Sequence, residues 1–264
     1  MYNFKYHKVN TIQEASNLLM SCDDPKILAG GHTLIPTLKQ RLSQPSDIID
    51  ISMIKDLNKI DLEDNKIIIG ALCTHNDIAS SIDVQSNIDG LSNLAQQIGD
   101  PQVRHRGTIG GSVANADPAA DYPAALLALD AKIYTSKSIY NADDFFIEMF
   151  ETAISSDEII QKIEFRVPIA SSYRKFRNPA SGYAMAGVFI AKFDDIVRVA
   201  ITGASPVVFR LRELEDALSN NFTTSVLDNI TIDSSDFNND IHASSKYRGN
   251  LVKVLIEEAI SDLI

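Results

Sequence analysis

The sequence has no tryptophan and only two cysteines, Cys22 and Cys73, among its 264 residues. The two thiols lie far apart in sequence, and their spacing fits neither a zinc site nor a disulfide framework. They are also too few for an iron–sulfur cluster, which is held by four cysteines. We therefore expect reduced thiols, no metal centre in this chain and a cytoplasmic location.

Long apolar runs and positive charge are also scarce. No segment approaches the ~18 consecutive apolar residues that predict a membrane-spanning helix, and Met1–Thr11 lacks the apolar core of a signal peptide. The formal net charge of −11 would repel nucleic-acid phosphates and anionic lipid headgroups. We therefore expect a globular protein that binds neither nucleic acid nor membrane, with enough apolar residues (45%) for a substantial core.

Both common nucleotide-binding fingerprints, GxGxxG and GxxxxGK[ST], are absent. The chain has instead a glycine pair, Gly30-Gly31, between a short apolar strand (Ile27–Leu28) and a segment with helical spacing that Thr33 can cap. The apolar face of that helix would comprise Leu34, Ile35, Leu38 and Leu42. Adjacent glycines allow consecutive backbone N–H groups to point at one anion. A single loop of this kind is more often a tight turn without a ligand.

A second glycine pair favours an anion-binding site over a tight turn without a ligand. The segment from Gly107 to Asn115 again combines adjacent glycines, Gly110-Gly111, with hydroxyl and amide side chains. Two glycine-rich loops suit a ligand with two phosphates, because each loop can offer N–H groups to one end of a pyrophosphate.

These loops carry a resemblance that extends over nearly the whole chain. AGGHT at 29–33 and TIGGS at 108–112 resemble the two flavin-binding motifs of the medium subunit of molybdenum hydroxylases, the carbon monoxide dehydrogenase and xanthine dehydrogenase family. Three further segments follow in the family's order: NADPAAD at 115–121, YRKFRNPASGYAMAGV at 173–188 and HASSKYRGNLVKVLIEEAI at 242–260.

The resemblance implies non-covalently bound FAD and no catalytic residue or metal ligand in this chain. The cofactor-binding residues that it implies are Leu28, Ala29, Gly30, Gly31, His32, Thr33, Leu34, Ile98, Thr108, Ile109, Gly110, Gly111, Ser112, Ala114, Asp117, Asp121, Ile160, Lys175 and Tyr183. Thr33 stands where the family commonly has serine and keeps the hydroxyl, whereas Ser112 falls at a variable position.

Several of these residues have an ordinary alternative role. His32 could contact a flavin phosphate or ribose, or could simply cap and pack. Asp121 could bind near the ribityl chain or ring, or cap the following helix. Lys175 could stabilise the anionic reduced flavin, or be a surface charge, and Tyr183 could cover one ring face or pack within a strand.

A basic cluster, Arg104-His105-Arg106, precedes the second glycine pair in an otherwise acidic protein. It could offset pyrophosphate charge or lie at a subunit contact, although a solvated loop is the ordinary reading. Arg177 and Tyr183 are further candidates for a subunit contact, because arginine and tyrosine are enriched at interfaces.

The mixture of strand and helix patterns predicts an α+β fold. The resemblance implies a two-part FAD-binding domain of the PCMH/vanillyl-alcohol-oxidase type at 1–170, divided into 1–54 and 55–170, and a C-terminal domain at 171–264 with a small antiparallel sheet. The patterns predict helices at 11–19, 90–98, 118–129, 210–218 and 243–263. They predict strands at 47–51, 66–69, 131–136, 159–167, 182–193 and 196–202. A long loop is expected at 100–112.

The resemblance also implies a division of labour between chains. A large molybdopterin subunit would oxidise substrate, a small subunit with two [2Fe-2S] clusters would relay electrons, and this chain would pass them from FAD to an external acceptor, in a dimer of heterotrimers. The alternatives are a free-standing flavin oxidoreductase of the same fold group and a structural subunit without flavin. The extra cysteines of the branch that acts on aromatic acyl-CoA are absent.

Overall fold

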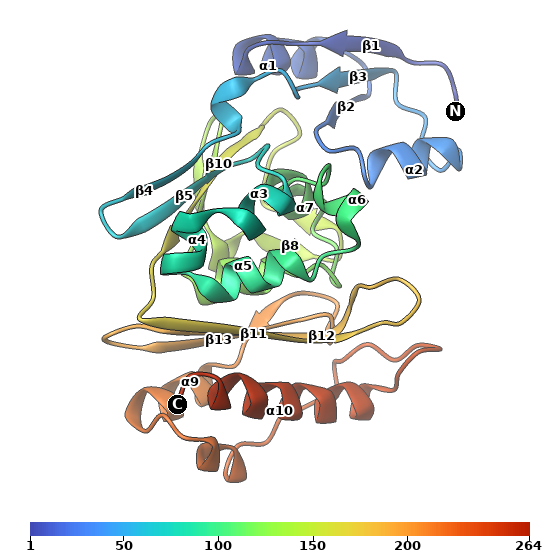
Figure 1. Ribbon diagram of the computed structural model, residues 1–264. Helices are drawn as coiled ribbons and strands as arrows, with labels where there is room; N and C mark the ends of the chain where they lie inside the picture. The colour runs from blue at the N-terminus through green and yellow to red at the C-terminus, as the bar shows by residue number, and fades with distance from the viewer.

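The computed structural model describes residues 1–264, and its sheets and helices form successive layers (Figure 1). A three-stranded sheet lies at the N-terminal end, a five-stranded sheet with several short helices follows, and a four-stranded sheet backed by two helices lies at the far end. The predicted α+β class is confirmed.

The N-terminal layer is a parallel sheet in the order β1-β3-β2. Its elements are β1 (Lys5–Lys8), α1 (Ile12–Ser21), β2 (Pro25–Leu28), α2 (Leu34–Lys39) and β3 (Asp47–Asp50). Thr11 caps α1 by accepting a hydrogen bond from the backbone N–H of Glu14, as its position before the helical pattern predicts.

The helix after the first glycine pair is shorter than expected. It ends at Lys39. Leu42 was expected on its apolar face but lies beyond the helix and is 74% exposed. Thr33 occupies the N-cap position but makes no capping hydrogen bond, so the expected cap is wrong. The backbone N–H groups at the start of α2 consequently have no side-chain partner.

The middle layer is an antiparallel sheet in the order β4-β5-β10-β6-β7. Its strands are β4 (Ile60–Glu63), β5 (Lys66–Gly70), β6 (Lys132–Thr135), β7 (Ile139–Asn141) and β10 (Ile160–Arg166), and β8 (Phe146–Glu148) pairs separately with β9 (Glu151–Thr152). Its helices are α3 (His75–Ser80), α4 (Ile82–Asn87), α5 (Asp89–Gln96), α6 (Pro101–Arg104), α7 (Ile109–Asn115) and α8 (Tyr122–Ala128), with short 3-10 turns at Lys55–Leu57 and Ala142–Asp144.

Two expectations for this layer are wrong. The segment 100–112 is not a long loop, because it contains α6 and the first turn of α7. The apolar helix expected from Pro118 begins only at Tyr122, since the residues before it form a turn in which Asp117 accepts a hydrogen bond from the N–H of Ala119.

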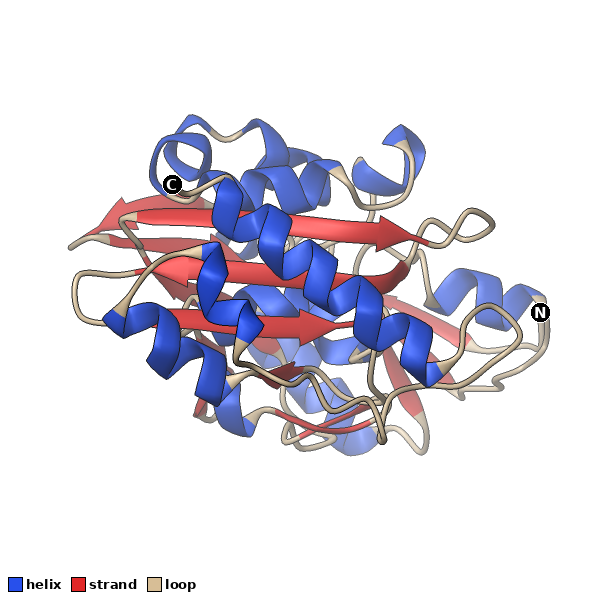
Figure 2. Ribbon diagram, turned by 90° about the horizontal axis from the view of Figure 1, so that it is seen from below, coloured by secondary structure: helices blue, strands red, loops and turns tan.

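The C-terminal layer is an antiparallel sheet in the order β11-β12-β13-β14. It comprises β11 (Ala170–Arg177), β12 (Ala184–Lys192), β13 (Val197–Thr202) and β14 (Phe209–Arg210), followed by α9 (Arg212–Asn220), a 3-10 turn at Thr224–Asp228 and α10 (Ser245–Ser261). The long helix that crosses in front of the strands in Figure 2 is α10.

The inner strand β12 of this sheet is buried on both faces. Along β12, Val188 and Ile190 belong to the apolar cluster with α10, whereas Phe189 and Ala191 belong to the cluster of the middle layer. Alternation along a strand sends successive side chains to opposite faces. The expected boundary between the two domains, at 170/171, falls at the start of β11. The largest apolar core contains residues from both sides of this boundary, and the domain limits stay a prediction. No helix is long and apolar enough to cross a bilayer.

Candidate functional site

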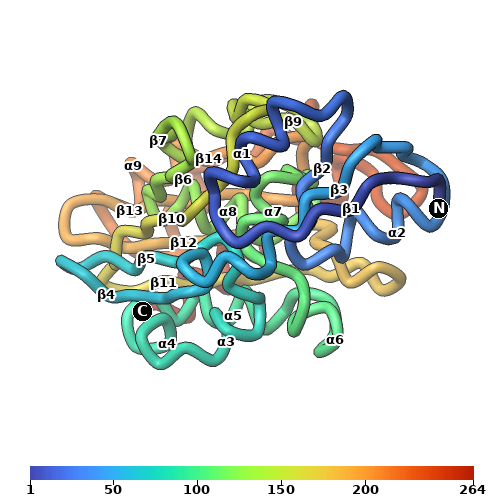
Figure 3. The backbone as a smooth tube through the Cα atoms, turned by 90° about the horizontal axis from the view of Figure 1, so that it is seen from above, coloured from blue at the N-terminus to red at the C-terminus, as the bar shows by residue number.

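A cavity of about 710 Å³ opens between the N-terminal layer, the helices of the middle layer and the turn between β11 and β12. Seen from above, residues 1–54 lie over the region of α7 and α8 (Figure 3). The cavity is within the size range of sites for cofactors and other small ligands. Both glycine pairs line it, as do residues of the segments at 115–121 and 173–188, whereas the segment at 242–260 contributes none.

The loop after β2 supplies unpaired backbone donors to this cavity. Ala29 to Leu34 all line it, and no protein group accepts a hydrogen bond from the backbone N–H of any of these residues. Backbone N–H groups are almost always paired with protein or water, so a consecutive run of free donors is a recognisable anion-binding arrangement. The side chains of His32 and Thr33 likewise have no hydrogen-bond partner in the protein.

The two glycine loops touch each other at Gly30. A Cβ at this position would lie 2.1 Å from the carbonyl oxygen of Arg106 and 2.9 Å from Cα of Gly107. Gly31 has a φ of +78°, a conformation that side-chain-bearing residues seldom adopt. Contact between the two loops thus requires glycine at position 30, and the backbone conformation favours glycine at position 31.

The second glycine pair does not form the open cradle that the sequence suggested. Thr108 caps α7 by accepting from the N–H of Gly111 at 3.2 Å, and the N–H groups of Ile109, Gly110 and Ser112 donate to Cys73, Ala71 and Thr108 carbonyls. The amides of this turn are therefore already paired, and the groups that it leaves available are the hydroxyls of Thr108 and Ser112.

The two glycines of this pair have different surroundings. A Cβ on Gly110 would lie 2.6 to 3.0 Å from Ala71, so this glycine allows α7 to pack on its neighbour. A Cβ on Gly111 would meet only Thr108 Oγ1, at 3.0 Å, and Gly111 is exposed and lines the cavity. Of this pair, Gly111 is thus the glycine whose backbone is open to the cavity, with the Thr108 hydroxyl as its one close neighbour.

A buried ion pair lies against the cavity wall. Nζ of Lys175 is 2.9 Å from Oδ1 of Asp121, and the two side chains are 1% and 5% exposed. Tyr173 donates its hydroxyl to the same carboxylate. Burial raises the pKa of Asp121, and the Lys175 ammonium and the Tyr173 hydroxyl oppose that shift. The surface-charge reading of Lys175 and the capping reading of Asp121 are both wrong.

His75, which the sequence did not single out, also lines the cavity. It begins α3, is 5% exposed, and its Nδ1 lies 3.2 Å from the hydroxyl oxygen of Tyr122. Burial, with His32 and Arg104 nearby, lowers the pKa of His75 to about 4. The imidazole is therefore neutral at physiological pH.

Tyr183 lies at the mouth of the cavity and is 45% exposed. Partial burial and the carboxylates of Asp117 and Asp121 raise its pKa. It precedes β12, so it is not packed within a strand, and its ring is available to a ligand or a partner.

Every residue that the sequence assigned to the cofactor lines this cavity except Ile109 and Lys175. Ile109 is fully buried in the core of the middle layer, and Lys175 reaches the wall only through Asp121. Polar lining residues that the sequence reasoning missed are Lys26, Thr37, Ser43, His75, Asn115, Glu158 and Ser181. Thr37, Asn115 and Ser181 lay in segments already noted, and the others carried no motif.

The chain matches a family described as the FAD binding domain in molybdopterin dehydrogenase over residues 2–168. It is 35% identical to the glyceraldehyde dehydrogenase medium chain of Sulfolobus acidocaldarius, with 98% of each chain covered. It is 36% identical to the carbon monoxide dehydrogenase medium chain of Hydrogenophaga pseudoflava, over 78% of this chain and 77% of that one. A solved carbon monoxide dehydrogenase from Hydrogenophaga pseudoflava contains a chain that superposes with a TM-score of 0.88 at 30% identity, covering 98% of this chain and 96% of that chain.

Proposed function

The chain belongs to the FAD-binding medium subunits of molybdenum hydroxylases of the carbon monoxide dehydrogenase and xanthine dehydrogenase type, and from this premise we propose that it works as an electron-transfer subunit. In this proposal it holds FAD non-covalently in the 710 Å³ cavity, takes electrons from the iron–sulfur clusters of a partner, and passes them to an external acceptor.

The observation that supports this most strongly is the run of unpaired backbone donors from Ala29 to Leu34. These N–H groups would hold the pyrophosphate, with the hydroxyls of Thr33 and Ser112 as additional donors. Gly111 also lines the cavity and has no side chain, which would allow a phosphate oxygen to come close to the backbone. The first loop thus supplies the hydrogen bonds and the second supplies the open surface.

Other lining residues of the cavity suit the flavin ring and ribityl chain. Ile98 and Ile160 provide apolar contacts, Tyr183 provides an aromatic face, and Asp121 provides a carboxylate for ribityl hydroxyls. Bound FAD would supply two-electron chemistry that no side chain of the protein can perform. Lys175 would act on the ring through Asp121, because its ammonium lies behind that carboxylate and does not line the cavity.

The cavity mouth is also the proposed contact with the iron–sulfur small subunit. The turn between α5 and α6, α6 itself and the turn before β12 border it, since Gly99, Val103 and Ser181 to Tyr183 are lining residues. Arg104 donates to the carbonyl of Ile98 at 3.0 Å and so fixes the local backbone, whereas Arg106 is exposed and unpaired. Arg106 is thus the better candidate for a partner contact.

The complete assembly in this proposal contains the iron–sulfur small subunit and the molybdopterin large subunit, as a dimer of heterotrimers. Substrate oxidation would occur on the large subunit. The medium-chain names of the similar proteins support such a partnership, and the acidic surface is compatible with a protein partner rather than nucleic acid.

The direct test is the visible spectrum of the purified chain together with the chains that co-purify with it. We expect flavin absorbance that acid precipitation releases, and no substrate turnover by the chain alone. Colourless protein with an intact fold would favour the structural subunit without flavin. Substrate turnover by the isolated chain would favour the free-standing oxidoreductase and contradict the proposal.

A further inference from the structure

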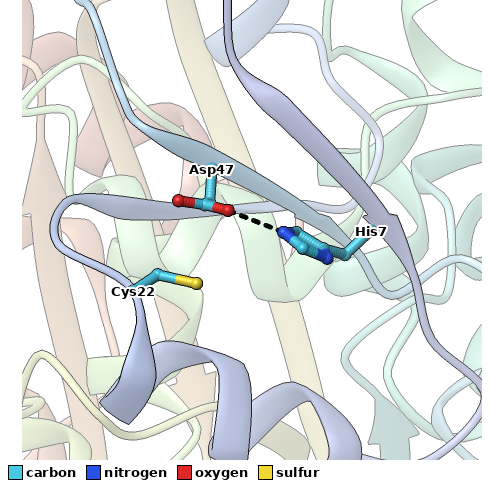
Figure 4. A group of neighbouring side chains, drawn as sticks. All are labelled: His7, Cys22 and Asp47. Atoms are coloured by element: carbon cyan, nitrogen blue, oxygen red, sulfur yellow. Dashed lines mark hydrogen bonds and ion pairs between the residues drawn. The ribbon is translucent and has the colours of Figure 1, made fainter.

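Outside the cofactor cavity, one cluster of side chains combines three different metal-binding groups. His7 on β1, Cys22 at the C-terminal end of α1 and Asp47 converge in the N-terminal layer, where β3 begins (Figure 4). The imidazole nitrogen, the thiol sulfur and a carboxylate oxygen all lie within 4.8 Å of one another. We propose that these residues form a binding site for a zinc-type divalent cation.

The carboxylate is the fixed centre of the cluster. The Asp47 side chain is 7% exposed, and its Oδ1 lies 2.6 Å from Nε2 of His7. Its other oxygen accepts from Ser46 Oγ at 2.7 Å, so the carboxylate is oriented by a neighbour that would remain in place after a metal bound. Such outer contacts hold ligands in position in known metal sites.

The sulfur is already directed toward this centre. Cys22 ends α1, where its backbone N–H donates to the carbonyl of Leu18, and its thiol faces Asp47 (Figure 4). The ligand atoms of a tetrahedral zinc site lie ~3.3–3.8 Å apart, given zinc–ligand bonds of about 2.0–2.3 Å. A cluster with separations up to 4.8 Å therefore needs side-chain adjustments of roughly an ångström or less.

The donor set selects the type of ion. Imidazole, thiolate and carboxylate together suit zinc, whereas calcium and magnesium prefer oxygen ligands alone. Three protein ligands leave the fourth position to water. Binding of the metal releases the thiol proton of Cys22 to the solvent, because the thiolate is the form that ligates the ion.

Metal binding at this point would clamp the base of the first glycine loop. β3 pairs with β1 on one side and with β2 on the other, and Asp47 lies opposite both Lys5 and Pro25 in the register. β2 leads directly into Ala29 and the unpaired N–H groups. The site would join β1, α1 and β3 without contacting the cavity, since none of its ligands lines it.

The test uses the full-length chain, freed of metal and titrated with Co²⁺ as a spectroscopic probe, followed by competition with Zn²⁺. We expect one Co²⁺ per chain, a thiolate-to-cobalt charge-transfer band in the difference spectrum, and displacement by Zn²⁺. Cys22→Ser should abolish the band, and both Cys22→Ser and His7→Gln should weaken binding at least ~10-fold.

The controls are the other cysteine and a histidine elsewhere. Cys73→Ser and His242→Gln should bind Co²⁺ as the unmodified chain does, because neither residue belongs to the cluster. Zn²⁺ should also raise the melting temperature of the unmodified chain but not that of Cys22→Ser. Absence of the thiolate band in the unmodified chain, or Co²⁺ binding that Cys22→Ser leaves unchanged, would overturn the proposal.

Discussion

Replacing Gly111 with alanine separates the stability of the fold from the binding of FAD. A Cβ here has one close neighbour, Thr108 Oγ1 at 3.0 Å, which must move by a few tenths of an ångström. Against that strain, alanine is favoured over glycine in a helix by about 1 kcal/mol, with less benefit in the first turn, where Gly111 lies. We expect the free energy of unfolding of the flavin-free chain to change by less than about 1 kcal/mol.

The same methyl group should weaken FAD binding substantially. In the proposed site it would occupy the space through which a phosphate oxygen would approach the bare backbone of α7. Displacing the phosphate from one or two charge-assisted hydrogen bonds, each worth about 1.5–3 kcal/mol, raises the dissociation constant by ~10-fold or more. Gly111→Val should lose most of the flavin while the chain stays folded.

The neighbouring glycines provide the contrast. Gly110→Ala would press its methyl against Ala71, and Gly30→Ala would place its methyl 2.1 Å from the Arg106 carbonyl oxygen. Overpacking of this kind typically costs 1–3 kcal/mol, so both variants should lower the melting temperature as well as the flavin content.

The assays are thermal unfolding of the flavin-free protein, followed by circular dichroism, and fluorescence titration with FAD. A Gly111→Ala variant that binds FAD as tightly as the unmodified chain would refute the assignment of this surface to the pyrophosphate. A large loss of stability in the same variant would refute the steric reasoning.

Three further predictions concern charge. Lys175→Met should lower the free energy of unfolding, measured in urea, by ~3–5 kcal/mol because the buried Asp121 carboxylate would lose its cation. The double variant Lys175→Met/Asp121→Leu should recover most of that loss. In the chain with FAD bound, Lys175→Met should remove ~1–2 kcal/mol of stabilisation of reduced flavin and so lower the midpoint potential by ~20–40 mV. Arg106→Glu should weaken co-purification with the partner subunits but leave flavin content unchanged, and the exposed Lys253→Glu on α10 should affect neither. The pKa of His75 is about 4 in the folded chain and about 6.5 when unfolded, so its contribution to stability is present above pH 6.5 and is lost as the pH falls toward 4. His75→Gln should flatten this part of the plot of unfolding free energy against pH. Identical plots for the variant and the unmodified chain would contradict the buried neutral imidazole.

The sequence predicted the elements whose local pattern agrees with their final packing. The apolar segments of β12 and β13 flank a turn at Asp194-Asp195, and α10 has one apolar face. All three elements were therefore expected within a few residues of their observed limits. The first glycine loop was also placed correctly between a strand and a helix. In these segments, neighbours in sequence are sufficient to determine the structure.

Elements that depend on distant neighbours were missed. β1 has the polar sequence KYHK and becomes a strand by pairing with β3, some forty residues later. α7 has adjacent glycines in its first turn, which disfavour helix in isolation, and it is stabilised by Thr108 and by packing on Ala71. The Lys175–Asp121 pair joins residues 54 positions apart, which no local pattern could indicate.

The carbonyl of Gln97 links the proposed partner surface to the proposed flavin site. It accepts hydrogen bonds from Arg177 at 2.8 Å and from Lys175 at 3.4 Å, and Lys175 pairs in turn with Asp121 on the cavity wall. Arg177 is exposed, so a partner that docks on it would act on the same carbonyl that holds the lysine. Docking would then alter the Lys175–Asp121 contact through a single peptide group, without any movement of the sheet.

If this link operates, Arg177→Met should shift the flavin midpoint potential in the isolated chain. Arg174→Met, on the same strand but paired with Asp262, should not shift it. Equal potentials in the two variants would show that the surface and the flavin site are independent.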